Sequence, residues 1–112
     1  MLIFAIDFDG TIVDHEFPKI GKEKKDAIRV LKRLQEEGNR IIIWTCRVGS
    51  ELEEIKKWLW ERHMNPDRFN ENYKNISYGW PKIYADVYLD DRSFPPFTNW
   101  LDVEKEFCRR KK

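Results

Sequence analysis

Hydrophobic positions along the chain follow two patterns that alternate from the N-terminus onward. Apolar runs predict three buried strands: about Leu2 to Asp7, Arg40 to Thr45 and Tyr84 to Leu89. Apolar residues at helical spacing predict three helices: about Lys22 to Glu37, Ser50 to His63 and Asn99 to Arg109. Strands that alternate with helices are typical of βαβ units, in which the strands run parallel.

Local signals mark the ends of several of these elements. Ser50-Glu51-Leu52-Glu53 matches the capping box of a helix start, Gly38 suits the position after a helix end, and Asn99 is a good N-cap. Residues 12–21 carry a proline and a terminal glycine, which predicts a short, partly exposed hairpin or flap. Asn75-Ile76-Ser77-Tyr78 predicts a short edge strand.

The order of these elements predicts the fold class. We expect residues 1–112 to form one α/β domain, Rossmann-like and three-layered, with a mostly parallel sheet and a short flap after the first strand. A chain of 112 residues is long enough for one compact domain and too short for two.

Composition narrows the class of protein further. The chain is 41% hydrophobic and 37% charged, which predicts a folded and highly charged domain. Its formal net charge of +1 gives no global electrostatic reason to bind nucleic acid or a membrane. No apolar run approaches the roughly 20 residues of a membrane span, and the N-terminal run lacks the features of a signal peptide. Cys46 and Cys108 form neither a metal-ligand spacing nor a disulfide framework, so we expect a cytoplasmic protein.

Polar residues follow each of the three predicted strands. Asp7 and Asp9 come after the first, Thr45 ends the second, and Asp90 and Asp91 follow the third. In parallel sheets ligands bind beyond the carboxyl ends of the strands, so these side chains are expected at one site. Four carboxylates at one edge would repel one another unless a cation lies between them.

Two kinds of cation would satisfy such a cluster. Mg²⁺ takes one or two carboxylates together with waters and a substrate phosphate, which suits this edge. The alternative is an ion-pair network made by the protein alone, for which Lys82, Arg47 and Arg92 are the nearest basic residues in the sequence.

The same residues resemble the four motifs of the haloacid dehalogenase-like (HAD) superfamily. Asp7-Phe8-Asp9-Gly10-Thr11 resembles the first motif and the apolar run that ends at Thr45 resembles the second. Lys82, with Lys74 as the alternative, is similar to the lysine of the third motif, and Leu89-Asp90-Asp91 resembles the fourth. The ordered set covers about residues 1–91.

The resemblance implies a Mg²⁺-dependent phosphomonoester hydrolase with an aspartyl-phosphate intermediate. Asp7 would attack phosphorus, and Asp9 would act first as general acid and then as general base. Thr45 and Lys82 would hold the phosphoryl oxygens.

The resemblance also implies the remaining contacts of the site. Mg²⁺ would be held by Asp7, by the backbone carbonyl of Asp9, and by Asp90 or Asp91. We assign substrate contacts to the backbone around Gly10 and Thr11 and to Arg47, with His15 in the flap as a weaker candidate.

Many members of this superfamily insert a cap domain after the first motif or between the second and third. Here Thr11 to Lys22 leaves room only for a flap, and Thr45 to Lys82 holds one helix and irregular chain. The resemblance is therefore to cap-less members, whose site is covered by the flap, by a neighbour in a homo-oligomer or by a macromolecular substrate. A small phosphorylated metabolite, a polynucleotide 3′-phosphate and a phosphoprotein all remain open as substrates, and nucleic acid enters only in that role. A non-catalytic module that binds phosphate or metal is the alternative from another class.

Overall fold

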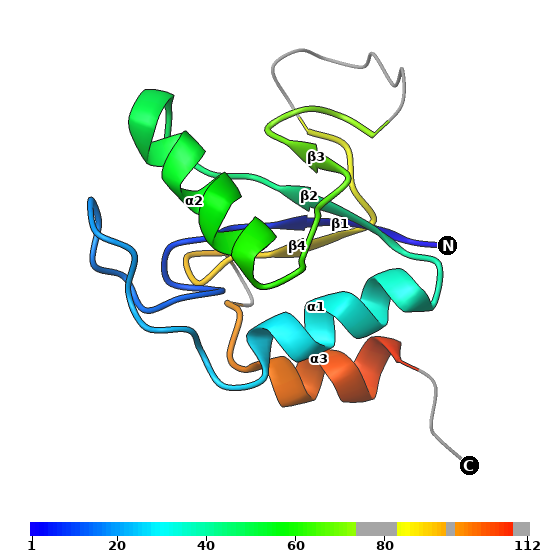
Figure 1. Cartoon of the computed structure of the whole chain (residues 1–112). Coiled ribbons are helices and arrows are strands. Elements are labelled where there is room, and N and C mark those ends of the chain that lie inside the picture. The colour runs from blue at the N-terminus through cyan, green and yellow to red at the C-terminus, as the bar shows by residue number, and fades with distance from the viewer. Residues whose placement is uncertain (74–82, 94–95, 109–112) are drawn as a thin grey trace.

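The computed structural model describes residues 1–73, 83–93 and 96–108, and it forms a sheet covered by helices (Figure 1). The described elements follow in chain order: β1 (Ile3–Ile6), α1 (Ala27–Glu36), β2 (Arg40–Ile43), α2 (Gly49–Glu61), β3 (Arg68–Phe69), β4 (Val87–Leu89) and α3 (Trp100–Phe107). Among the described residues, no helix is both long enough and apolar enough to cross a membrane.

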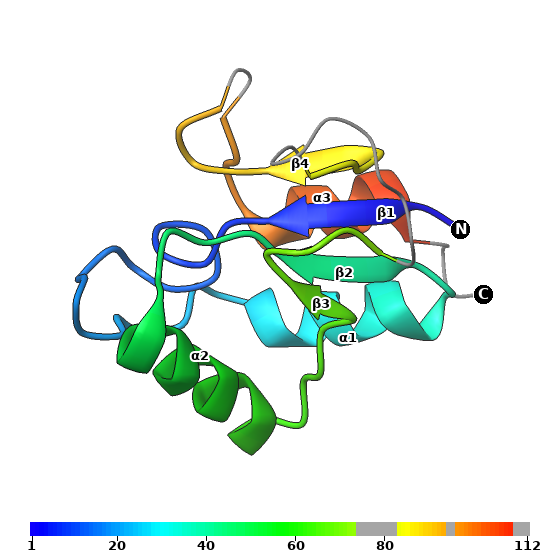
Figure 2. The same ribbon diagram turned by 90° about the horizontal axis from the view of Figure 1, so that it is seen from above.

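The strands form one parallel sheet in the order β3-β2-β1-β4, as Figure 2 shows from above. Phe4 of β1 pairs with Ile41 of β2 on one side and with Val87 of β4 on the other. The predicted α/β class and the parallel sheet are therefore confirmed. The two-residue strand β3 was not predicted from the sequence.

The two faces of the sheet are covered differently. Phe4 and Ile6 lie in one hydrophobic cluster with buried residues of all three helices: Val30, Leu31 and Leu34 of α1, Ile55 and Leu59 of α2, and Trp100 and Val103 of α3. Ile3 and Ala5 pack on the opposite face with Ile42 and Ile83. The chain moves in the same direction across the sheet in β1-α1-β2 and in β2-α2-β3. Since such crossovers are right-handed, α1 and α2 are expected on the same face of the sheet. The described ends of the connection from β3 to β4 pack on the other face, because Tyr73, Ile83 and Ala85 join the cluster there.

Helix α1 begins five residues later than predicted, at Ala27 and not at Lys22. Asp26, its N-cap, has a left-handed backbone with φ 66°. The preceding residues pair with the flap, because Lys24 N–H donates to the carbonyl of Ile12 at 2.9 Å. The predicted Gly38 end is confirmed, since Gly38 lies just after the C-cap with φ +93°.

The predicted capping box at Ser50 is wrong. Val48 is the N-cap of α2, so Ser50 lies within the first turn and its hydroxyl contacts Glu51 at 3.5 Å. The predicted cap of α3 is confirmed, because the Asn99 side chain accepts a hydrogen bond from Asp102 N–H at 2.8 Å. The predicted edge strand at 75–78 and the helix end at 109 lie outside the described residues.

Residues 12–21 form the predicted flap, and it begins as an irregular hairpin. Val13 bridges Glu23 in antiparallel fashion, and Asp14 N–H donates to the carbonyl of Lys22 at 2.8 Å. Residues 14–19 are exposed, whereas Ile12 and Val13 are fully buried. The flap is therefore anchored at its base and projects from the carboxyl edge of the sheet.

Candidate active site

Three carboxylates converge at the carboxyl edge of the sheet. Asp7 directly follows β1, and Asp90 and Asp91 follow β4, the strand beside it. The Asp7 N–H donates to the carbonyl of Leu89 at 2.9 Å, which continues the pairing of the two strands to their ends. One oxygen of each carboxylate lies within 4.8 Å of the others. The structure thus brings together three of the four acids that the sequence placed at this edge.

The convergence has an electrostatic consequence for Asp7. Burial, and next the charges of Asp90 and Asp91, raise the pKa of Asp7 to about 7, against an ordinary value of 3.8. None of the causes of this shift is a positive charge on a described residue. These residues fit a divalent cation on two grounds: all their ligand atoms are oxygens, and their mutual repulsion calls for a positive charge.

Asp9 does not join this group, because Arg47 binds its carboxylate. Arg47 Nε and Nη2 each donate to one oxygen of Asp9, both at 2.8 Å. The Arg47 side chain is only 1% exposed, and its hydrogen bonds to Asp9 raise the pKa of the guanidinium above its usual range. The alternative of a protein-made ion pair therefore holds for Asp9, while the other three acids lie close enough together to hold a metal ion.

Thr45 lies at the end of β2, on the opposite side of β1 from β4. Its N–H donates to Asn70 Oδ1 at 2.8 Å, and its hydroxyl oxygen accepts from Arg47 N–H at 3.1 Å. The hydroxyl accepts this bond and keeps its own proton as a donor. Lys82 and its alternative Lys74, both predicted to bind phosphate, lie outside the described residues.

Gly10 and Thr11 contact Asp91 of the acidic group and help to define its position. Gly10 has φ +90°, and a Cβ at this position would overlap the carboxylate of Asp91. Thr11 is fully buried, its hydroxyl oxygen accepts from Asp91 N–H at 3.2 Å, and its carbonyl accepts from Trp100 Nε1 at 2.8 Å. Its side chain does not line the cavity and instead helps to position Asp91. The predicted contact between the backbone here and a substrate stays a prediction.

A cavity of about 280 Å³ lies in front of the acids. Its lining combines the acids, the segment after β2 and the tip of the flap: Asp7, Asp9, His15, Phe17, Thr45, Cys46, Arg47, Asp90, Asp91 and Arg92. Two larger hollows, of about 500 and 650 Å³, lie beside α3 and below the flap, but they hold no such convergence of acids. The small cavity is therefore the candidate active site.

Sequence reasoning missed two residues of this site. Asn70, which has a left-handed backbone with φ 54°, holds the end of β2 through Thr45. Phe17 belongs to the flap and reaches the cavity. An asparagine next to a two-residue strand and an aromatic residue before a proline carry little local signal. The acids and Thr45 were found because each directly follows an apolar strand.

Fold and site together define a parallel α/β protein with an acidic cluster at the carboxyl edge of its sheet. A solved structure of a conserved protein from Bacteroides thetaiotaomicron is similar to it, with a TM-score of 0.89 and 34% sequence identity over 99% of this chain and 93% of that one. The chain therefore belongs to the same family as that protein. No family model matches the sequence. No curated protein matches it either.

Proposed function

We propose that the protein is a Mg²⁺-dependent phosphomonoester hydrolase of the HAD type, with Asp7 as nucleophile. The observation that carries this proposal is the convergence of Asp7, Asp90 and Asp91 within 4.8 Å at the carboxyl edge of a parallel sheet. Thr45 lines the same cavity and supplies a hydroxyl group for a phosphoryl oxygen. The resemblance of all four sequence motifs to the HAD superfamily points to the same reaction.

The chain's own residues divide the reaction into two displacements. A carboxylate oxygen of Asp7 attacks phosphorus, the bond to the leaving oxygen breaks, and Asp9 supplies the proton that this oxygen needs. In the second displacement Asp9 takes a proton from water, the resulting hydroxide attacks phosphorus, and inorganic phosphate leaves Asp7. Mg²⁺ bound by Asp7, Asp90 and Asp91 would neutralise the charge between the carboxylate and the phosphoryl group.

A metal-dependence assay and one substitution test this proposal. The wild-type protein is expected to hydrolyse p-nitrophenyl phosphate with Mg²⁺ and to lose this activity in EDTA. Asp7→Asn is expected to lower kcat by at least about a thousandfold, because an amide cannot serve as the nucleophile. Asp26→Asn is the matched control, since Asp26 lies at the N-terminus of α1 and suits asparagine. Equal turnover by Asp7→Asn and wild type would refute the mechanism.

One observation favours a second candidate, a non-catalytic module that binds metal and phosphate. Both oxygens of Asp9 accept hydrogen bonds from Arg47, so the residue assigned as general acid is engaged elsewhere. Such a module would bind Mg²⁺ and inorganic phosphate in calorimetry without hydrolysing any phosphate ester. An enzyme would in addition trap beryllofluoride on Asp7, because the adduct requires a nucleophile aligned with the incoming phosphoryl group.

The substrate class is a separate question, because the described residues form no cap domain over the site that could select small metabolites. A panel of phosphorylated metabolites, oligonucleotide 3′-phosphates and phosphopeptides would separate the three substrate classes. The cavity of about 280 Å³ favours substrates that present one phosphoryl group on a slender attachment.

A further inference from the structure

Arg47 is an unusual member of the site, because it lines the cavity yet is almost entirely enclosed by the protein. Its side chain is 1% exposed and donates four hydrogen bonds. Two reach the carboxylate of Asp9, and the others reach the carbonyls of Pro18 at 3.1 Å and Lys19 at 3.0 Å in the flap. An arginine used in this way has little donor capacity left for a substrate phosphate.

Two aromatic rings strengthen the same connection. The guanidinium carbon lies 5.0 Å from the ring centre of Phe17 in the flap and 5.8 Å from that of Phe8 next to the site. Phe8 is fully buried, whereas Phe17 is 50% exposed. Arg47 therefore holds the flap through two carbonyls and a ring, and holds the site through Asp9 and a second ring.

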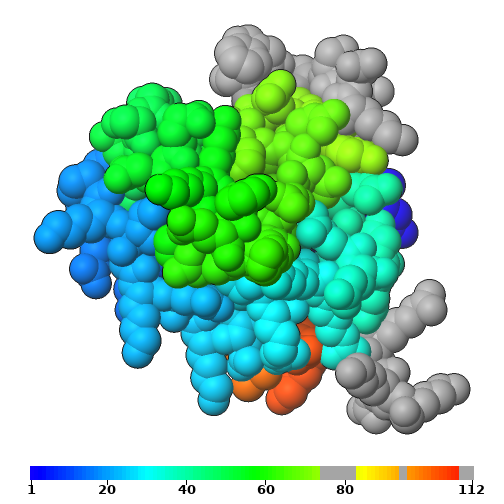
Figure 3. Space-filling view, viewed as in Figure 1, coloured from blue at the N-terminus to red at the C-terminus, as the bar shows by residue number. Residues whose placement is uncertain are grey.

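The position of Arg47 in the chain explains why its side chain can reach both the flap and Asp9. It lies between the end of β2 and the start of α2. In the space-filling view the flap, in blue, lies directly beside the start of α2, in green (Figure 3). The backbone of Arg47 is fixed as well, because its N–H donates to Thr45 Oγ1 at 3.1 Å.

We propose that Arg47 is a positioning residue that latches the flap over the site and fixes the Asp9 carboxylate in one orientation. The latch keeps the flap over the site, where His15 and Phe17 line the cavity. The latch thereby also limits the size of the substrate. The effect on catalysis and specificity rests on the proposed function, whereas the latch itself does not.

Hydrogen exchange tests the latch without any substrate. Arg47→Lys keeps the positive charge but cannot bond both oxygens of Asp9 and two carbonyls at once. Amides of residues 14–20 are expected to exchange at least about tenfold faster in this variant, while those of β1 and β2 keep their wild-type rates. Arg29→Lys is the matched control, because Arg29 also grips a carboxylate with two nitrogens, but between α1 and α3. It should leave the flap rates unchanged.

Steady-state kinetics test the positioning role. With p-nitrophenyl phosphate, Arg47→Lys is expected to lower kcat by about tenfold or more and to change KM by less than about threefold. A phosphotyrosyl peptide carries a similar aryl leaving group on a much larger body. The ratio of kcat/KM for the peptide to that for p-nitrophenyl phosphate should rise in the variant, because the flap no longer restricts the entrance.

The possible outcomes distinguish a failure of the Arg47 latch from a failure of the proposed phosphatase activity. Unchanged exchange at residues 14–20 overturns the latch, and a raised KM with wild-type kcat overturns the positioning role in favour of direct substrate binding. If the wild-type protein hydrolyses no phosphate ester, the proposed function and the positioning role fail together, while faster flap exchange in Arg47→Lys still supports the latch. A thermal melt of each variant confirms that the fold is retained before either measurement.

Discussion

Gly10 lets the chain turn sharply between Asp7 and the flap, and its lack of a side chain leaves room for the Asp91 carboxylate. Its φ of +90° disfavours any residue with a side chain, and an added Cβ would overlap the Asp91 carboxylate. Gly38 has almost the same backbone, with φ +93°, but no atom lies within 4 Å of a Cβ built there. Alanine substitutions at the two glycines should therefore both strain the backbone, but only the one at Gly10 should also displace Asp91.

Gly38→Ala is expected to lower the free energy of unfolding by roughly 1–2 kcal/mol, the cost of a left-handed backbone with a side chain. Gly10→Ala should cost more than this and should also weaken Mg²⁺ binding by about tenfold, because Asp91 must move. Thermal denaturation and a Mg²⁺ titration of both variants check the two effects. Equal Mg²⁺ affinity in the two variants would show that the position of Asp91 does not depend on Gly10.

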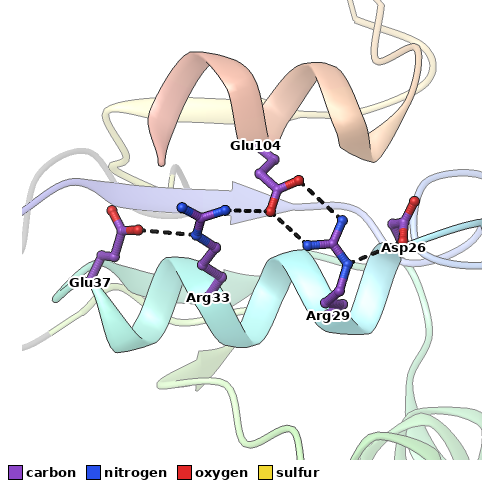
Figure 4. Close-up of polar contacts among 5 residues, drawn as sticks. All are labelled: Asp26, Arg29, Arg33, Glu37 and Glu104. Atoms are coloured by element: carbon purple, nitrogen blue, oxygen red, sulfur yellow. Dashed lines mark hydrogen bonds and ion pairs between the residues drawn. The ribbon is translucent and has the colours of Figure 1, made fainter. Parts of the chain in front are cut away.

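At the scale of elements, α1 and α3 pack side by side on one face of the sheet and share a set of ion pairs (Figure 4). Glu104 of α3 accepts from Arg29 Nη1 at 2.7 Å and Nη2 at 3.1 Å, and from Arg33 Nη1 at 2.7 Å. The hydrogen bonds from Arg29, and then those from Arg33, lower the pKa of Glu104 to about 2. Its side chain is 16% exposed, so solvent screens this network only in part.

Glu104→Gln is expected to lower the Tm by a few degrees at pH 7, because two arginines lose their shared carboxylate. Glu106→Gln on the same helix is the control, since Glu106 is exposed to solvent. The difference in stability between wild type and Glu104→Gln should shrink as pH falls from about 4.5 towards 2. A difference that stays constant over this range would mean that the charge of Glu104 does not stabilise the packing.

The elements also show how far the sequence alone can predict this molecule. The strands β1 and β2 and the acids that follow the strands were predictable, because an apolar run that ends in carboxylates is a local pattern. The start of α1 was not, because Lys22 to Lys25 have ordinary helix propensity and are drawn away by pairing with the flap. The two residues of β3 are held by side chains on either side, since Asp67 accepts from Ile41 N–H and Asn70 from Thr45 N–H.

The pairing of Asp9 with Arg47 lies beyond local pattern for a similar reason. The two residues are 38 positions apart, and either of two other basic residues near the edge was an equal candidate in the sequence. Only the path of the chain after β2 decides which cation meets which acid. Ion pairs between residues far apart in the sequence depend on the tertiary fold. It is therefore harder to predict which residues of a site pair with one another than to predict which residues belong to the site.

At the scale of the whole molecule, the pH dependence of stability combines two opposite contributions. Glu104 has a lowered pKa, so its contribution is present above about 4.5 and is lost as pH falls towards 2. Asp7 has a raised pKa of about 7, so the folded chain holds a proton between pH 4 and 7 that the unfolded chain releases. This contribution therefore falls as pH rises through that range.

The metal-free protein should accordingly lose stability between about pH 4 and 7 through Asp7, and Asp7→Asn should remove this loss. In EDTA the variant is expected to match wild type near pH 4 and to exceed it by about 1 kcal/mol at pH 8, a value reduced for the partial solvent screening of the site. Mg²⁺ at pH 8 should raise the Tm of wild type more than that of the variant, because the cation offsets the repulsion that the substitution has already removed. Thermal melts of both proteins from pH 4 to 8, with Mg²⁺ and with EDTA, test these expectations. If Asp7→Asn were less stable than wild type in EDTA at pH 8, a positive charge within the protein would already compensate Asp7, and the acidic cluster would not need a metal ion.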